Sequence, residues 1–292
     1  MPVVYIHGVA VREHLGGTPS PGPGGLIDHL LANISWEMIQ PLLRRFIAPE
    51  ISDKASDVPI EQVYWGDIGA RMAWDGASCL PTRPDFKAPG RSRLLWEVRR
   101  PLNRLVAEFF GDVFSYLHNR GTADAPGPIP QRALATLAEA QAHKDRTGEP
   151  IVVLTNSMGG QIMYDVVTHF LPRLPEYSGI RVDFWCSVAS QVALFEEMKL
   201  FLESSPEYSL ANGNKAPMPS PKHLGAWWNV WDIDDIISYS AHDIFEGVDD
   251  STFHVGKALV KEHMGYLQQE SFYKLFAERI RAALPSDPAR DA

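Results

Sequence analysis

The chain has 292 residues, of which 45% are hydrophobic, enough to bury one large core, so we expect a single globular domain over residues 1–284. Its 27 basic and 36 acidic side chains give a formal net charge of -9, and because the acidic residues are scattered, nucleic acid is not expected as a partner. The two cysteines, Cys79 and Cys186, have no second Cys or His at metal-ligand spacing, which argues against a disulfide framework and a zinc site.

The first predicted element is an apolar, β-branched run over Val3–Ile6 that stops at His7 and Gly8, a pattern typical of a buried parallel strand. Met1 leads straight into this strand without a basic segment or a separate hydrophobic leader, so we expect no cleaved secretion signal. No window of the sequence approaches the roughly 18 uninterrupted apolar residues of a membrane span. These observations predict a soluble, cytoplasmic protein.

Strand-like and helix-like segments then alternate along the chain. Strands are predicted at residues 59–65, 151–154, 182–189, 226–231 and 252–255, and helices at residues 36–47, 131–144, 161–171 and 269–284. Such alternation implies a mainly parallel sheet covered by helices on both faces, which is the α/β class. The tail over residues 285–292 is expected to be flexible.

A long insertion separates the second predicted strand from the third, over about residues 76–125. It begins in a stretch rich in Pro, Gly and Arg over residues 76–92. From Leu94 to Leu117 apolar residues recur at three- and four-residue steps, which predicts an amphipathic helix, or two helices divided near Pro101. The insertion falls where a helical cap or lid could cover a site.

The sharpest chemical pattern is Ile-Val-Val-Leu-Thr-Asn-Ser-Met-Gly-Gly, residues 151–160. A strand, a sharp turn with small neighbours and a helix hold a serine hydroxyl away from the backbone, which a serine nucleophile requires. Ser157 is therefore the candidate nucleophile, and the Met158 N–H at the helix start would face a developing oxyanion. Gly159 supplies one glycine of a Gly-x-Ser-x-Gly motif, but Thr155 stands at the other, so the match is partial.

These residues resemble the nucleophile elbow of the α/β-hydrolase superfamily, and the chain order of His7-Gly8, Ser157, Asp235 and His263 resembles its lipase-like branch. The resemblance covers most of the chain and implies an α/β-hydrolase fold. In that family a His-Gly pair after an early strand opens the oxyanion loop. The residue after the glycine, here Val9, would give the second oxyanion N–H.

Three carboxylates, Asp232, Asp234 and Asp235, follow the predicted strand at residues 226–231 and compete for the role of the acid. The segment resembles the family's Asn-x-x-Asp-x-x-Asp-x-Val turn, and this register selects Asp235 to orient the histidine. Asp232 is the second choice, or a structural cap of the turn. All three could also simply be solvated side chains on a surface loop.

Among ten histidines, His263 follows the acid and lies in Lys-Glu-His-Met-Gly-Tyr-Leu, which resembles the family's His-x-x-Tyr segment. We expect it to be the general base, because the base must reach Ser157 from a loop. His254 is the rival. It stands between Phe253 and Val255 in a predicted strand, where packing or a surface position is the expected role.

The insertion carries aromatic residues that could form an acyl-binding wall, namely Trp96, Phe109, Phe110, Phe114 and Tyr116. Packing of such a stripe on the core is the other interpretation, and it is favoured for most of these residues. A neighbouring group of arginines could attract an anionic head group or simply be solvated: Arg91, Arg93, Arg99, Arg100 and Arg104.

The resulting hypothesis is a serine esterase or lipase that acts through an acyl-enzyme, with Ser157, His263 and Asp235 as the triad and with no metal or organic cofactor. Its substrate would be a small-molecule or lipid ester, and its cap could contact a membrane peripherally. Two alternatives remain: an inactive scaffold of the same fold that binds an acyl ligand or a protein partner, and an amidase or peptidase with the same triad. The sequence leaves the oligomeric state open.

Overall fold

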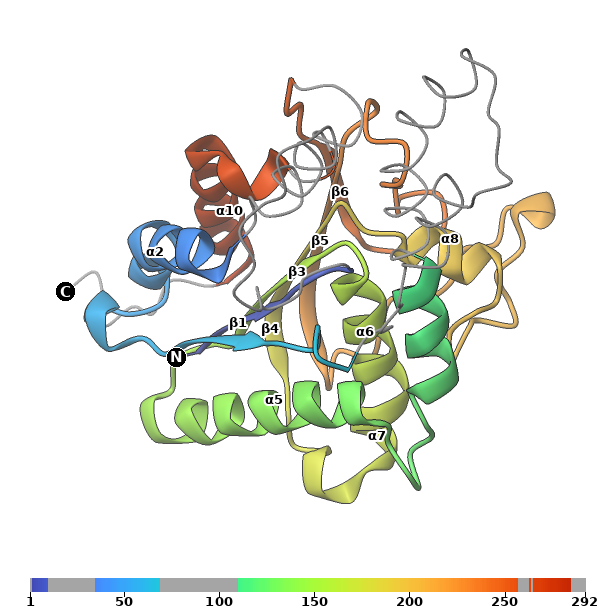
Figure 1. Cartoon of the computed structure of the whole chain (residues 1–292), viewed down its shortest axis with the longest axis horizontal. Helices are drawn as coiled ribbons and strands as arrows, with labels where there is room; N and C mark the ends of the chain where they lie inside the picture. Colours follow the sequence, from blue (N-terminus) through green and yellow to red (C-terminus); the bar gives the residue numbers. More distant parts are fainter. Residues whose placement is uncertain (1, 10–34, 69–109, 257–262, 264, 285–292) are drawn as a thin grey trace, which may run out of the picture.

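The computed structural model describes residues 2–9, 35–68, 110–256, 263 and 265–284. Its centre is a six-stranded sheet in which every pair of neighbouring strands is parallel (Figure 1). The strands are β1 (Val3–Ile6), β2 (Ile60–Val63), β3 (Val152–Asn156), β4 (Val182–Val188), β5 (Leu224–Trp231) and β6 (Asp249–Thr252). With its covering helices this sheet belongs to the α/β class, as the alternation in the sequence predicts.

The strand order across the sheet is β2-β1-β3-β4-β5-β6, which puts β3 between β1 and β4. The registers pair Ile6 with Thr155 and Asn156 with Val188, so these strands end at the same edge. β1 and β3 are buried along their whole length, as expected for parallel strands covered on both faces. The loops after β1, β3, β4 and β5 therefore meet at one edge of the sheet.

Helices cover both faces of the sheet. One face packs against α5 (Pro128–Thr147) and α6 (Gly159–Asp165), and the other packs against α2 (Trp36–Phe46) and α10 (Glu270–Ala283), as Figure 1 shows. Other helices within the described residues are α7 (Leu171–Arg173), α8 (Val192–Glu197), the π-helical Val166–Phe170, residues 110–119, and the short 3-10 turns Ala48–Glu50, Ala55–Asp57, Pro175–Tyr177, Leu210–Asn212 and Tyr266–Gln268. α6, the π-helical turn and α7 follow one another without a break over residues 159–173. The observed helical segment therefore extends slightly beyond both ends of the helix predicted at residues 161–171.

The last strand lies three residues earlier than its sequence suggests. We expected residues 252–255, but β6 is Asp249–Thr252, which starts with two residues that rarely form strands. Side chains of β5 compensate, because Asn229 Nδ2 donates to Asp250 Oδ1 at 2.7 Å and Trp228 Nε1 donates to Ser251 Oγ at 2.7 Å. Contacts across the sheet therefore outweigh the local preference.

Only part of the predicted cap insertion lies within the described residues. Residues 76–109 and the tail 285–292 lie outside them, while residues 110–119 form a helix that precedes α5. Tyr116 of this helix is fully buried, and its hydroxyl donates to Asp165 Oδ2 of α6 at 2.8 Å. Among the helices that the structure describes, none is long and apolar enough to cross a membrane.

Candidate active site

Ser157 occupies the tight turn between β3 and α6. Its φ of 51 lies in the left-handed region, which costs a residue with a side chain about 1–2 kcal/mol. The turn is held on both sides: the Ser157 N–H donates to Val188 O at 2.9 Å, and the Gly160 N–H donates to Ser157 O at 3.0 Å. A strained serine that its surroundings hold in place is typical of a functional site.

Glycines let neighbouring segments of the chain approach this turn. A Cβ at Gly159 would collide with the carbonyl oxygen of Ile6 in β1, and a Cβ at Gly160 would collide with Ser190 Oγ. Thr155 stands where the motif usually has its other glycine, but it is an ordinary residue of β3 with room for its side chain. Trp185 Nε1 donates to Thr155 Oγ1 at 2.9 Å, so the threonine is accommodated.

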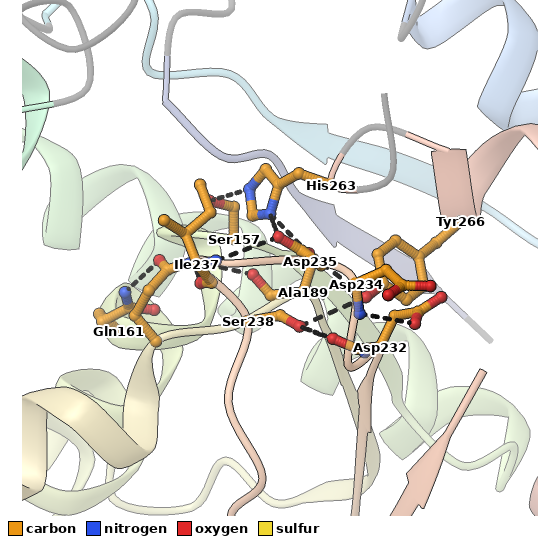
Figure 2. A network of polar contacts seen from close by, with 11 residues as sticks. Ser157, Gln161, Ala189, Asp232, Asp234, Asp235, Ile237, Ser238, His263 and Tyr266 are labelled. Atoms are coloured by element: carbon orange, nitrogen blue, oxygen red, sulfur yellow. Dashed lines mark hydrogen bonds and ion pairs between the residues drawn. The ribbon is translucent and has the colours of Figure 1, made fainter. Parts of the chain in front are cut away.

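The structure brings three of the predicted site residues into one hydrogen-bonded series. Ser157 Oγ lies 3.0 Å from His263 Nε2, and His263 Nδ1 lies 2.8 Å from Asp235 Oδ2 and 3.1 Å from Asp235 Oδ1 (Figure 2). All three residues are buried. A hydroxyl, an imidazole and a carboxylate in this order can transfer the serine proton to the imidazole while the carboxylate fixes its orientation.

The turn after β5 shapes the position of Asp235. The Asp235 N–H donates to Asp232 O at 3.2 Å, and the Ile237 N–H donates to Asp235 Oδ1 at 3.2 Å. Tyr266 lies three residues after His263 and donates its hydroxyl to Asp235 Oδ2 at 3.3 Å. Burial and the nearby Asp235 charge raise the pKa of Tyr266, so its phenol stays protonated and can donate.

Asp232, the second choice for the acid, caps the same turn. Its Oδ2 accepts from the Val255 N–H at 2.8 Å and its Oδ1 accepts from the Asp234 N–H at 3.1 Å. Burial alone would raise the pKa of Asp232, but these N–H donors and His254 outweigh it and keep the pKa below its ordinary value. Asp234 is 57% exposed. Of the three carboxylates, Asp235 is the one that contacts His263.

His254 lies at the surface beside the same turn. Its side chain is 68% exposed, and its Nδ1 lies 3.5 Å from Asp232 Oδ2. Strand β6 ends before this residue, so the predicted strand around His254 is wrong and its expected surface position is what the structure shows. Within the described ranges, Asp232, Asp234 and His254 form the one group whose ligand atoms, within 4.8 Å of one another, could hold a metal ion.

The loop after β1, which is the expected oxyanion loop, touches the turn that carries Ser157. A Cβ at Gly8 would lie 2.7 Å from the Cβ of Ser157, so a glycine is needed for this approach. Val9 is half-buried and packs against the core cluster that contains the fully buried Met158. Met158 directly follows Ser157 in the chain, and Val9 directly follows the glycine that approaches Ser157.

Trp65, two residues after β2, holds this loop, a role that the sequence did not suggest. Its Nε1 donates to His7 O at 2.9 Å, its backbone N–H donates to His7 Nε2 at 3.0 Å, and its ring stacks on His7 with centroids 5.1 Å apart. Because His7 Nε2 accepts, the proton lies on Nδ1, which is 2.6 Å from Gly8 O. His7 thus holds the loop through its ring.

The site thus brings together a hydroxyl, an imidazole, a carboxylate and two backbone segments at a tight turn, which are the groups that nucleophilic acyl transfer uses. The sequence did not point to Trp65 or to the buried glutamines Gln161 and Gln191, because these residues belong to no motif. The Tyr in the His-x-x-Tyr segment could be recognised in the sequence, but its contact with Asp235 could not.

Comparison of the sequence with known protein families and with curated proteins found no match.

Proposed function

We propose that this protein is a serine hydrolase of the α/β-hydrolase fold that cleaves carboxylic esters through an acyl-enzyme. The observation that carries the proposal is the series from Ser157 Oγ to His263 Nε2 at 3.0 Å and from His263 Nδ1 to Asp235 Oδ2 at 2.8 Å. The serine at its start has a left-handed φ of 51. Because this turn joins the serine hydroxyl to an imidazole and a carboxylate, which a scaffold that only binds a ligand does not need, the arrangement favours catalysis over the inactive alternative.

The geometry supports the following reaction. Ser157 Oγ attacks the ester carbonyl carbon as its proton passes to His263 Nε2, and Asp235 stabilises the imidazolium that forms. The oxyanion would bind the N–H groups of Val9 and Met158. His263 then gives the proton to the leaving alcohol, and the acyl group stays on Ser157. A water molecule, activated by the same histidine, releases the acid and restores the serine.

The arrangement of the elements supports the fold assignment. In α/β hydrolases the nucleophile sits on a turn between a strand and a helix, one oxyanion N–H follows it and another comes from an earlier loop, and the triad runs Ser, Asp, His along the chain. Here Ser157 follows β3, the Gly8 loop follows the neighbouring β1, and Asp235 follows β5. His263 comes last in the chain.

The substrate in this proposal is a small-molecule or lipid ester, and the acid and base need no metal or organic cofactor. A fluorophosphonate probe tests the nucleophile directly, because it bonds covalently to an activated serine. We expect labelling of the wild-type protein at Ser157, no labelling of Ser157→Ala, and hydrolysis of p-nitrophenyl esters by the wild type alone. A folded wild type that neither reacts with the probe nor hydrolyses these esters contradicts the proposal.

Amide hydrolysis uses the same groups and differs in the leaving group. Turnover of matched ester and amide substrates with the same acyl part therefore distinguishes an esterase from an amidase or peptidase. We expect the ester to be preferred. Faster turnover of the amide would keep Ser157 as the nucleophile and change the class of substrate.

A further inference from the structure

A buried relay of side chains connects the turn that carries Asp235 to the helix that follows Ser157. Gln191 Nε2 donates to Ile237 O at 2.7 Å, and Gln191 Oε1 accepts from Gln161 Nε2 at 2.8 Å. Ser190 Oγ donates to Gln161 Oε1 at 3.2 Å. The three polar side chains are almost completely buried. Figure 2 shows Gln161 and Ile237 in one network with the triad.

The end of β4 places Gln191 in this relay. Ala189 directly follows β4 and has a φ of 54, a left-handed conformation that turns the chain sharply. Gln191 Nε2 also donates to the carbonyl oxygen of Ala189 at 2.9 Å. Ser190 packs on the start of α6, where a Cβ at Gly160 would collide with its hydroxyl. The segment is thus fixed against the turn of the nucleophile.

The residue that Gln191 holds is the same residue that holds the acid. Ile237 accepts from Gln191 at its carbonyl oxygen, and its N–H donates to Asp235 Oδ1 at 3.2 Å. Asp235 is therefore tied to the turn of Ser157 by two routes, one through His263 and one through Ile237 and the two glutamines. A triad works only when its members are held within about 0.5 Å of their productive positions.

We propose that Gln191 is a positioning residue for the reaction of Ser157, acting through Ile237 to fix where Asp235 meets His263. The inference rests on the proposed function. A glutamine suits this place because it donates to two carbonyl oxygens and accepts from Gln161, which an apolar side chain of the same volume cannot do. Packing alone would be satisfied by methionine.

Gln191→Met tests the role, because methionine keeps the length of the side chain and removes its hydrogen bonds. Asp183→Asn is the matched control. Asp183 is buried near the start of β4, at the opposite edge of the sheet from Ser157, and it accepts from the Ile151 N–H at 2.7 Å and from Lys144 Nζ at 2.6 Å. Both variants weaken a buried polar cluster and should lower Tm.

We expect Gln191→Met to lower kcat on the order of 10²-fold with KM little changed, because a displacement of about 1 Å in a catalytic group costs this much. Asp183→Asn should keep the wild-type kcat once the active sites are titrated with the fluorophosphonate probe. If Gln191→Met also keeps the wild-type kcat at a similar loss of Tm, Gln191 is only structural and the inference is wrong, while the proposed function stands.

A second measurement does not depend on turnover. A proton shared between His263 Nδ1 and Asp235 gives a strongly downfield proton NMR resonance, assigned by its loss in His263→Gln. We expect this resonance in the wild type and in Asp183→Asn, and its loss or shift in Gln191→Met. An unchanged resonance in Gln191→Met overturns the inference. A wild type that shows the resonance but neither reacts with the fluorophosphonate probe nor hydrolyses an ester or an amide overturns the proposed function, and with it any role of Gln191 in a reaction.

Discussion

The hydroxyl of Tyr266 donates to Asp235 Oδ2 at 3.3 Å, the same carboxylate oxygen that lies 2.8 Å from His263 Nδ1. The phenol therefore helps to satisfy a buried carboxylate that would otherwise depend on fewer donors. Ser238 Oγ lies 3.3 Å from the Tyr266 hydroxyl, so the tyrosine also connects the acid to the far end of its own turn. Such a contact helps to hold Asp235 in position beside His263.

Tyr266→Phe should lower kcat by about tenfold, which corresponds to roughly 1.4 kcal/mol, with little change in KM. The reason is that the long bond to Asp235 supports the acid but does not replace the bond from Ile237. Steady-state kinetics with a p-nitrophenyl ester measures the effect. A loss as large as that of Asp235→Asn would mean that the phenol takes a direct part in the reaction.

The left-handed backbone of Ser157 predicts a difference between two inactive variants. Ser157→Ala and Ser157→Gly should both lower kcat by on the order of 10⁴-fold or more, because both remove the nucleophile. Glycine adopts a positive φ without strain, so Ser157→Gly should be about 1 kcal/mol more stable than Ser157→Ala. Urea unfolding of the two proteins measures this difference. Equal stabilities would contradict the strain that we assign to this turn.

The α/β class and the sharp turn that carries Ser157 could be predicted because their patterns are local. The apolar run of β3, the small residues after Ser157 and the alternation of strands and helices all appear within short windows of the sequence. The strand at residues 3–6 was found for the same reason. Asp235, in contrast, was chosen over Asp232 by resemblance, because a row of carboxylates does not show which one faces a histidine.

The supporting residues could not be predicted because their roles depend on contacts between distant segments. Trp65 holds His7 from 58 positions along the chain, and Gln191 reaches Ile237 from 46 positions away. Neither residue belongs to a motif. The start of β6 was missed because its acidic residues are held from elsewhere in the chain: Asn229 of β5 binds Asp250, and Arg279 of α10 binds Asp249.

Two of the three carboxylates in the turn after β5, Asp232 and Asp235, should respond differently to loss of charge. Asp235→Asn should lower kcat by roughly 10³- to 10⁴-fold, because the amide cannot hold His263 in the required tautomer. Asp232→Asn should lower kcat far less, since Asp232 binds the N–H groups of Val255 and Asp234. Kinetics of both variants with one ester decides the ranking. The reverse order would move the acid to Asp232.

Asp232 also predicts a pH dependence of stability. Its pKa in the folded protein lies below the ordinary value of 3.8, so the ionised form is favoured by folding. That stabilisation is complete above the unfolded value and is lost as the pH falls through it toward the folded pKa. The difference in unfolding free energy between wild type and Asp232→Asn should therefore be constant near neutral pH and shrink below about pH 4. A difference that grows in acid would reverse the sign of the shift.

Phe114 offers a test of the cap hypothesis within the described residues. Its side chain is 63% exposed and stacks on Phe110 with ring centroids 6.1 Å apart, whereas Tyr116 on the same helix is buried. The helix thus packs on the core through some of its aromatic residues and leaves others exposed at the surface. An exposed ring adds little to stability but can contact an acyl chain, at about 0.8 kcal/mol for each methylene that it helps to bury.

Phe114→Ala should consequently leave Tm nearly unchanged and lower kcat/KM for long-chain p-nitrophenyl esters more than for the acetate. Tyr116→Phe is the control on the same helix, because it removes the buried hydrogen bond to Asp165 and keeps the ring. It should lower Tm without changing the preference among acyl chains. A packing role for Phe114 predicts the opposite pattern, since a cavity in the core costs roughly 3–5 kcal/mol for a phenylalanine and would reduce activity on every ester together. Melting curves recorded beside kcat/KM for short and long esters separate the two, and a uniform loss with a large fall in Tm would exclude a part for Phe114 in substrate selection.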